Sequence, residues 1–178
     1  MTISLQKQNQ KTMESMTLTI TRADLCDRIF AATAYTARAR EAMGTPPAIT
    51  ERILATADDN AMLYPLIENS VNEVNSDIVR YLPGSTAEFD EDESGGHYIF
   101  NIRLPANYPT GNGRKLQQSI GSNIAGRVLQ EWYASVKPDE VAMTAARIQN
   151  DTMTLQALLT QRTKPSNRMT DYEKHYNN

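Results

Sequence analysis

The side chains that could serve as nucleophile, base or soft metal ligand are few and lie far apart in this sequence. Its one cysteine is Cys26, and its two histidines are His97 and His175. No phosphate-binding loop, nucleophile elbow or metal-ligand spacing joins them to other polar residues. We expect Cys26 to fill a buried or half-buried helical position, because no histidine is near it in sequence. We expect His97 to be a surface or packing residue. The sequence therefore predicts no reaction: not an enzyme, with no catalytic residue, no cofactor and no metal.

A run of acidic residues surrounds a predicted turn near the middle of the chain. Its members are Glu88, Asp90, Glu91, Asp92 and Glu93, and two glycines follow. The spacing lacks the alternating ligands and the fixed glycine of a calcium loop. A run of like charge usually faces water, which favours a solvated hairpin tip. Two functional alternatives stay open: the tip repels DNA inside a channel, or it pairs with basic residues of a neighbouring molecule.

Residues 111–115 read Gly-Asn-Gly-Arg-Lys and lead into a predicted helix. Backbone donors at a helix start, together with two cations, would suit a phosphate group. The stretch lacks the spacing of a phosphate-binding loop and the Ser or Thr that follows its lysine. A plain loop with a basic helix start is the alternative that we prefer.

The elements that would position these residues are mostly helical. Apolar side chains at helical spacing predict a first helix that opens at Thr21 and ends before Gly44, a short helix over 50–57, and longer ones over 59–82, 116–133 and 138–162. Alternation from His97 to Leu104 predicts a strand, and residues 86–89 form its hairpin partner. One hairpin is too little sheet to be stable alone. We expect it to pack on the helices or to pair with a neighbouring subunit.

The last predicted helix carries an apolar seam with 4-3-4-3-4 spacing, interrupted by Thr152. Such a seam is typical of a helix that packs along another helix, within the subunit or across an interface. Trp132 ends the stripe of the preceding helix, and two tyrosines lie near the end of the chain. As interface candidates we take Val141, Ala145, Ile148, Leu155, Leu159, Trp132, Tyr172 and Tyr176.

Composition limits the remaining possibilities. The chain has 178 residues, a net charge of −3 and 40% hydrophobic residues, which fits one domain with polar extensions. Residues 1–17 are predicted to be a flexible N-terminal arm, residues 18–162 the helical domain with its hairpin at about 86–104, and residues 163–178 an extended C-terminal arm. The C-terminal residues are either solvent-exposed chain or an arm that folds onto another protein. The acidic balance excludes a general electrostatic grip on nucleic acid, and no apolar stretch approaches membrane-spanning length.

This order of parts resembles the head–tail connector (adaptor or neck) proteins of tailed bacteriophages. The resemblance covers about residues 20–160 and lies in the helix over 59–82, the hairpin over 86–104 and the helix that follows. Within it, Ala-Met-Leu-Tyr-Pro-Leu-Ile at 61–67 leads to Val-Arg-Tyr-Leu at 79–82. It implies a mainly α fold: a bundle of four to five helices with one inserted β-hairpin and extended polar termini. The helix and tail after Pro138 exceed the minimal pattern of that family.

The resemblance also implies a function. Such proteins form rings, usually twelvefold, between the portal and the tail, where DNA passes through without sequence-specific contacts. The expected partners are therefore copies of the chain and portal and tail proteins, with no membrane. The expected location is the neck of the virion, after assembly in the host cytoplasm. The alternative is a non-viral helical protein-binding or regulatory module that acts through the helix over 138–162.

Overall fold

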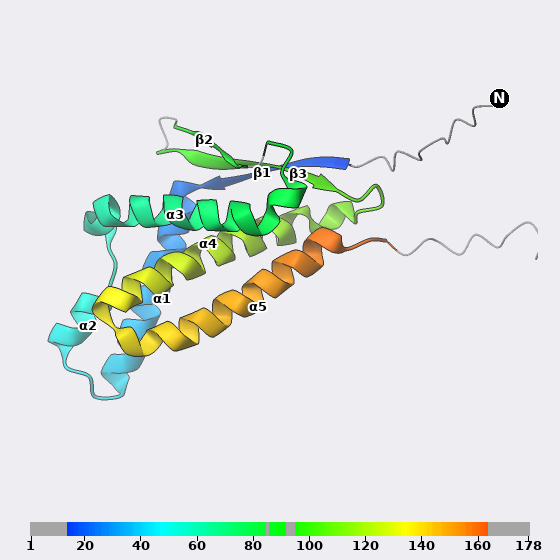
Figure 1. The fold of residues 1–178 in the computed structure, drawn as a ribbon. Helices are drawn as coiled ribbons and strands as arrows, with labels where there is room; N and C mark the ends of the chain where they lie inside the picture. Colours follow the sequence, from blue (N-terminus) through cyan, green and yellow to red (C-terminus); the bar gives the residue numbers. More distant parts are fainter. Residues whose placement is uncertain (1–13, 85, 92–94, 164–178) are drawn as a thin grey trace, which may run out of the picture.

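The computed structural model describes residues 14–84, 86–91 and 95–163. Its fold class is the predicted one, mainly α with a small β element. The longer elements are β1 (Glu14–Thr21), α1 (Arg22–Ala42), α2 (Pro47–Ile53), α3 (Asn60–Ile78), β2 (Glu88–Asp90), β3 (His97–Leu104), α4 (Gly113–Val136) and α5 (Val141–Thr160). Figure 1 shows the sheet on one side of the helices, with α3 and α4 beneath it and α5 beyond α4.

The sheet has three antiparallel strands in the order β1-β3-β2, where the sequence predicted only a hairpin. The missed strand is β1, whose Leu18 pairs with Phe100. Residues 14–17, predicted to belong to a flexible arm, are therefore the first half of a strand. Alternation of Met16, Leu18 and Ile20 with threonines and Ser15 is the signal that could have revealed it. The predicted hairpin gains its stability from this strand within the same chain.

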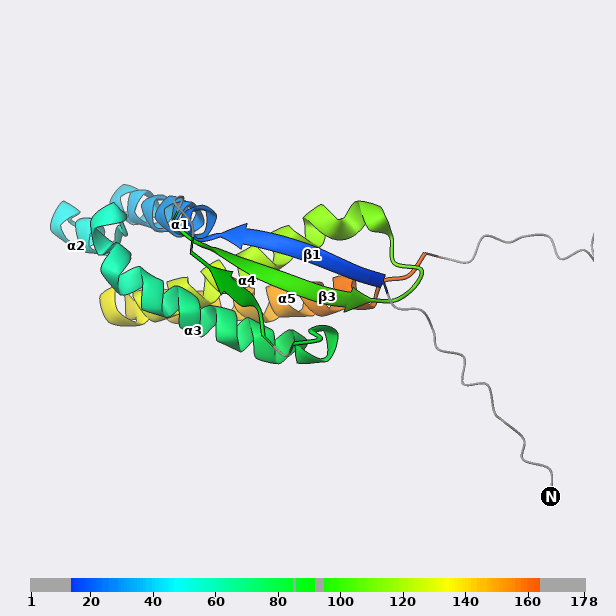
Figure 2. The same ribbon diagram turned by 90° about the horizontal axis from the view of Figure 1, so that it is seen from above.

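The inner face of the sheet supplies much of the core. Tyr98, Phe100, Ile102 and Leu104 alternate along β3 and are all buried, as their period of two requires. They pack with Leu18 and Ile20 of β1 and with the apolar faces of the helices in one cluster. Figure 2, seen from above, shows β1 and β3 lying along α4. The sheet and the helices thus stabilise one another around a common core.

Helix α1 begins and ends as the sequence predicts. The Oγ1 of Thr21 accepts a hydrogen bond from the backbone N–H of Asp24 at 3.0 Å, which caps the helix. At the other end the chain leaves the helix through Gly44, whose φ of 89° is a conformation that favours glycine. In Figure 1, α1 descends from the sheet and crosses α4. Helix α1 therefore extends from the end of β1 to the side of the molecule opposite the sheet.

Helices α4 and α5 pack against each other along most of their length. A Cβ atom added at Gly126 of α4 would lie 3.2 Å from the Cγ1 of Ile148 on α5, so glycine permits this close approach. Further along, the amide of Asn123 donates to the Oγ1 of Thr152 at 3.1 Å. The residue that interrupts the seam thus has a polar partner, and the α5 seam packs within the subunit.

The first and last described residues lie at the same end of the molecule. Glu14 pairs with Leu104 at the end of β3. Just beyond that strand, the backbone oxygen of Asn107 accepts hydrogen bonds from the N–H and the Oγ1 of Thr163, each at 2.8 Å. In Figures 1 and 2, β1 starts at the same end of the molecule at which α5 stops. Glu14 and Thr163 therefore lie at one end of the fold.

Candidate functional site

The predicted acidic tip lies at the edge of the sheet. Glu88 and Asp90 belong to β2, Glu91 follows it, and all three are exposed; Asp92 and Glu93 lie outside the described residues. The Oδ2 of Asp90 is 3.7 Å from the Nε2 of His97 on β3. His97 therefore faces an acid of the hairpin, in the packing role that the sequence predicted. Exposed acids on an edge strand also discourage pairing with a further strand.

A cation–π cluster that the sequence did not predict holds the β2 edge of the sheet to α3. The guanidinium of Arg22 lies between two rings, with its carbon 4.4 Å from the ring centre of Tyr64 and 4.6 Å from that of Phe89. One guanidinium nitrogen also lies 3.7 Å from the carboxylate of Glu68. Arg22 is buried, although it is the first residue of α1. A cation at that position opposes the helix dipole, and this conflict is the signal in the sequence that it has a special environment.

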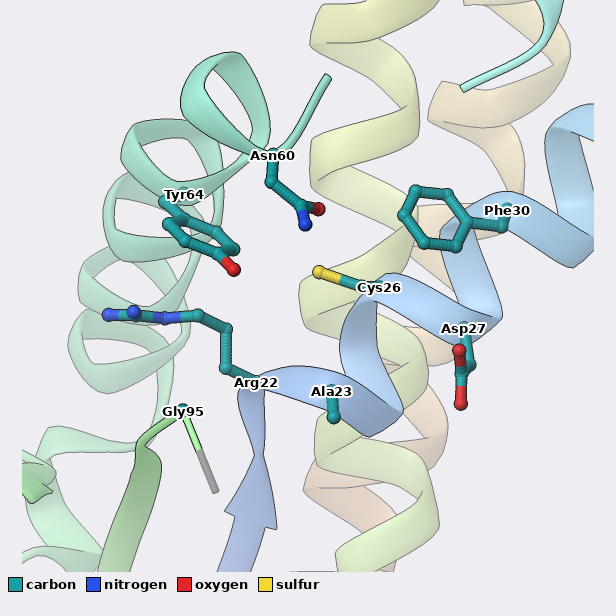
Figure 3. A pocket seen from close by; sticks show the side chains of 8 residues that line it. All are labelled: Arg22, Ala23, Cys26, Asp27, Phe30, Asn60, Tyr64 and Gly95. Atoms are coloured by element: carbon teal, nitrogen blue, oxygen red, sulfur yellow. The ribbon is translucent and has the colours of Figure 1, made fainter. Parts of the chain in front are cut away.

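A hollow of about 210 Å³ lies beside Arg22 and is also lined by Cys26, Asn60 and Tyr64 (Figure 3). The sulfur of Cys26 points toward Asn60 and Tyr64, whereas the carboxylate of Asp27 points away from it. Burial raises the pKa of the Cys26 thiol, and the charge of Arg22 offsets only part of that rise. The thiol therefore stays protonated near neutral pH and is a weaker nucleophile than an ordinary cysteine.

Residues 111–115 form a loop and a helix start, as in the hypothesis of a plain loop with a basic helix start. A short turn over Thr110–Asn112 leads into α4 at Gly113. The amide of Asn112 donates to the Oε1 of Gln161 at 2.8 Å, which ties this turn to the end of α5. Arg114 and Lys115 are exposed on the first turn of α4.

A large concave surface lies between α1 and α5, over α4. It is a groove of about 480 Å³ with Ala32 and Tyr35 on one side, Gly126 and Leu129 on its floor, and Met143 on the other side. A second hollow of about 250 Å³ shares residues with it and extends it. We call the two together the α1–α5 groove. Small side chains on α1 and α4 leave this space open.

Polar groups within the α1–α5 groove already have partners. The hydroxyls of Tyr133 and Thr36 lie 2.9 Å apart in a hydrogen bond. The buried carboxylate of Glu140 accepts a hydrogen bond from the Nε of Arg40 at 2.6 Å. Burial raises the pKa of the Tyr133 phenol, so it remains a neutral donor or acceptor. The floor thus presents an apolar surface without an unpaired charge at these positions.

Two arginines and two large apolar side chains border the α1–α5 groove. Arg28 donates to the Oγ of Ser122 at 3.2 Å, and Arg147 lies 3.9 Å from Asp151 with 70% of its side chain exposed. Tyr35 and Met143 are 77% and 66% exposed. Large exposed apolar residues beside an apolar groove are typical of a surface that another protein covers. The α1–α5 groove is therefore the best candidate for a binding site in this fold.

Most of the predicted interface residues lie inside the subunit instead. Ile148, Leu155 and Leu159 are buried against α4, and Val141 and Ala145 are half-buried. Trp132 is buried too, and its Nε1–H donates to the backbone oxygen of Ile53 at 2.9 Å. The buried part of the seam therefore packs against α4 of the same chain, and contact of these residues with another subunit stays a prediction. The two tyrosine candidates, Tyr172 and Tyr176, lie outside the described residues.

Within residues 14–84, 86–91 and 95–163, no group of three or more His, Cys, Asp or Glu side chains is placed to hold a metal ion. In the same part of the chain, no helix combines the length and the apolar character needed to cross a membrane. Comparison of the chain with protein-family models, with curated proteins and with solved structures found no match.

Proposed function

We propose that this chain is a structural subunit that assembles with copies of itself into a head-to-tail connector ring of a tailed bacteriophage. The observation that carries the proposal is the α1–α5 groove, which is apolar and bordered by the exposed side chains of Tyr35 and Met143. A surface of this kind is costly to leave in water and gains stability when another protein covers it. The resemblance in element order supports the connector role specifically.

The acidic edge of the sheet supports a place beside DNA. Glu88, Asp90 and Glu91 are exposed on or next to the edge strand β2, and Arg22 anchors that strand through Phe89. Carboxylates along a channel would repel the phosphates of DNA and let it slide through without binding. In the proposed ring this edge faces the lumen. The partners in the neck would then be the portal on one side and tail proteins on the other.

Assembly with a portal ring tests this function. We expect the isolated chain to sediment as a monomer or weak oligomer, and to form a ring visible by electron microscopy when portal rings are added. A chain that ends at Thr163 keeps the bonds to Asn107, so it should fold and yet fail to assemble. Normal assembly of this shortened chain would refute the role of the C-terminal arm. Absence of any ring from the full chain with its portal would refute the connector function.

The alternative function, a non-viral regulatory module that acts through α5, has one observation in its favour. Met143 and Met153 of α5 are exposed, so this helix keeps apolar side chains outside its packed seam. Such a module would give a discrete dimer or a one-to-one complex. Measurement of mass at several concentrations separates the two proposals, since a ring subunit adds copies beyond two.

A further inference from the structure

We propose that the α1–α5 groove binds the C-terminal segment 169–176 of a neighbouring copy of this chain. This inference rests on the proposed function, because it names the contact that would join successive subunits. Three properties of the groove carry it: its length, its apolar floor and the arginines on its border. Each matches a property of that segment's sequence.

The segment has the apolar spacing of a helix that binds in a groove. Met169, Tyr172 and Tyr176 follow one another at intervals of three and four residues, which places them on one helical face. As a helix the segment would be about 11 Å long, and the wall of the groove from Arg28 to Thr36 is about 12 Å long at 1.5 Å per residue. Aromatic residues are also the commonest anchors of protein interfaces.

Charge agrees with this match. Arg147 stands on the border of the groove with most of its side chain in water and only a distant acid at 3.9 Å. Glu173 borders the apolar face of the segment, one residue after Tyr172. A helix that places Tyr172 on Gly126 and Leu129 would bring Glu173 near Arg147. The glutamate that lines the groove, Glu140, is neutralised by Arg40 and would not repel the segment.

Length favours a neighbour's segment over the chain's own. Thr163 lies at the far end of α5 from Thr144, at least about 24 Å away along the helix. With 169–176 helical, the chain between Thr163 and Tyr172 spans at most about 25 Å, and only as a straight line. The chain's own segment would reach the wide part of the groove fully stretched. A segment from a neighbouring copy has no such restriction, and each copy offers one groove and one segment, as a head-to-tail ring requires.

A mixing experiment with full-length variants tests the inference. Ala31→Trp fills the groove of one variant, and the double variant Tyr172→Ala, Tyr176→Ala removes the anchors of the other. We expect each variant alone to self-associate at least about tenfold more weakly than the natural chain. Mixed together, they should form a one-to-one complex, because one supplies an intact segment and the other an intact groove. The matched control Ala146→Trp, on an exposed position of α5 outside the groove, should associate normally.

Charge reversal and cross-linking complete the test. Arg147→Glu should weaken self-association by about tenfold, and the added change Glu173→Arg should restore it. A photoreactive residue at position 172 should cross-link to α1 or α5 of a second molecule. A cross-link within one molecule, or none to these helices, would overturn the proposal. Rings that form with portal while cross-links map elsewhere would refute this contact and leave the connector function standing; specific cross-linked pairs without rings would do the reverse.

Discussion

Arg22 is a cation at the N-terminus of a helix, an unfavourable position that its contacts in the fold make favourable. The positive end of the α1 dipole disfavours a cation at this position. The ring faces of Tyr64 and Phe89 and the carboxylate of Glu68 offset that cost and hold β2 against α3. The position of Arg22 in the chain is readable from the sequence, whereas its two aromatic partners are 42 and 67 residues away and come together only in the fold.

Replacing Arg22 should therefore destabilise the protein and loosen the hairpin. We expect Arg22→Ala to lower the free energy of unfolding by about 1–3 kcal/mol, through lost contacts with both rings and with Glu68. Denaturant titration measures the change, and near-ultraviolet circular dichroism reports the aromatic environment. Arg52→Ala, at an exposed position of α2, is the control and should change stability by less than about 0.5 kcal/mol. Equal stability of the two variants would contradict the role assigned to Arg22.

Buried phenols should make the fold sensitive to alkali. Burial raises the pKa of Tyr98, Tyr108 and Tyr133 in the folded chain. Their contribution is complete below the ordinary tyrosine pKa of about 10, and it declines above that pH, where only the unfolded chain releases the protons. We expect the free energy of unfolding to fall between about pH 10 and pH 11, with a shallower fall for Tyr133→Phe. Denaturant titrations at several pH values in this range measure the fall. If the free energy of unfolding falls with pH equally steeply in the natural chain and in Tyr133→Phe, burial of Tyr133 is not the cause.

Whole elements show where sequence patterns suffice and where they do not. The long helices and β3 follow from their periodicity, and α1 also from its Thr21 cap, because local side-chain spacing decides which face is buried. Helix α2 spans Pro47–Ile53 and not the predicted 50–57, since Pro47 is well placed in the first turn of a helix. The sequence pattern places the first half of β1 in an arm, because a polar run precedes it and its partner β3 lies about 80 residues away. The seam of α5 was predicted correctly as a packing surface, but spacing alone cannot say which helix it meets. Here Ile148, Leu155 and Leu159 meet α4 of the same chain.

The strand β1 can be tested against the arm that the sequence suggested. Ile20 is buried against the core and pairs with Tyr98, whereas Thr19 is exposed. We expect Ile20→Ala to lower the free energy of unfolding by about 2–4 kcal/mol, as for other large buried aliphatic side chains. Thr19→Ala should change it by less than about 0.5 kcal/mol. Chemical denaturation decides the matter, and a negligible effect of Ile20→Ala would return this segment to the arm.

Two glycines of α4 should respond in opposite ways to alanine. At Gly126 the new Cβ would meet the buried Ile148 at 3.2 Å, and at Gly121 it would meet the movable end of Arg28 at 3.4 Å. Alanine favours a helix by about 1 kcal/mol over glycine, so Gly121→Ala should stabilise the protein by up to that amount. Gly126→Ala should lose that gain to crowding, because the atom that it meets belongs to a buried side chain of α5. Thermal unfolding of the two variants tests the order of their stabilities. Equal stabilisation by both alanines would show that α5 moves aside at little cost in free energy.

At the scale of the whole molecule, the mainly α class and the single shared core were predictable, while the binding surface was not. Composition and spacing predict helices that must bury one face. The α1–α5 groove arises because Ala31, Ala32 and Gly126, from two helices that cross, happen to face the same space. Small residues in a sequence give no sign of whether their space is filled by a third helix. Only the packing of the described helices shows that residues 14–163 leave this space open, apart from the short gaps at 85 and 92–94.

The end of the described chain gives a test of how far the fold extends. Thr163 makes two hydrogen bonds to the backbone oxygen of Asn107 and receives one from its amide. We expect a chain that ends at Thr163 to unfold at the same denaturant midpoint as the full chain. One that ends at Gln161 should lose up to about 1 kcal/mol, because these bonds are partly exposed. Equal midpoints for both truncations would show that the contact between Asn107 and Thr163 does not stabilise the fold.

The position of Glu14 and Thr163 at one end of the fold has a consequence for any cyclic assembly of this chain. Rotation about a single axis relates equivalent residues, so Glu14 of every copy lies at one height along that axis and Thr163 of every copy lies at one height. Every copy therefore presents this end of the fold in the same orientation relative to the axis. A partner ring that binds this end would meet the same surface on each copy and would distinguish one face of the assembly from the other.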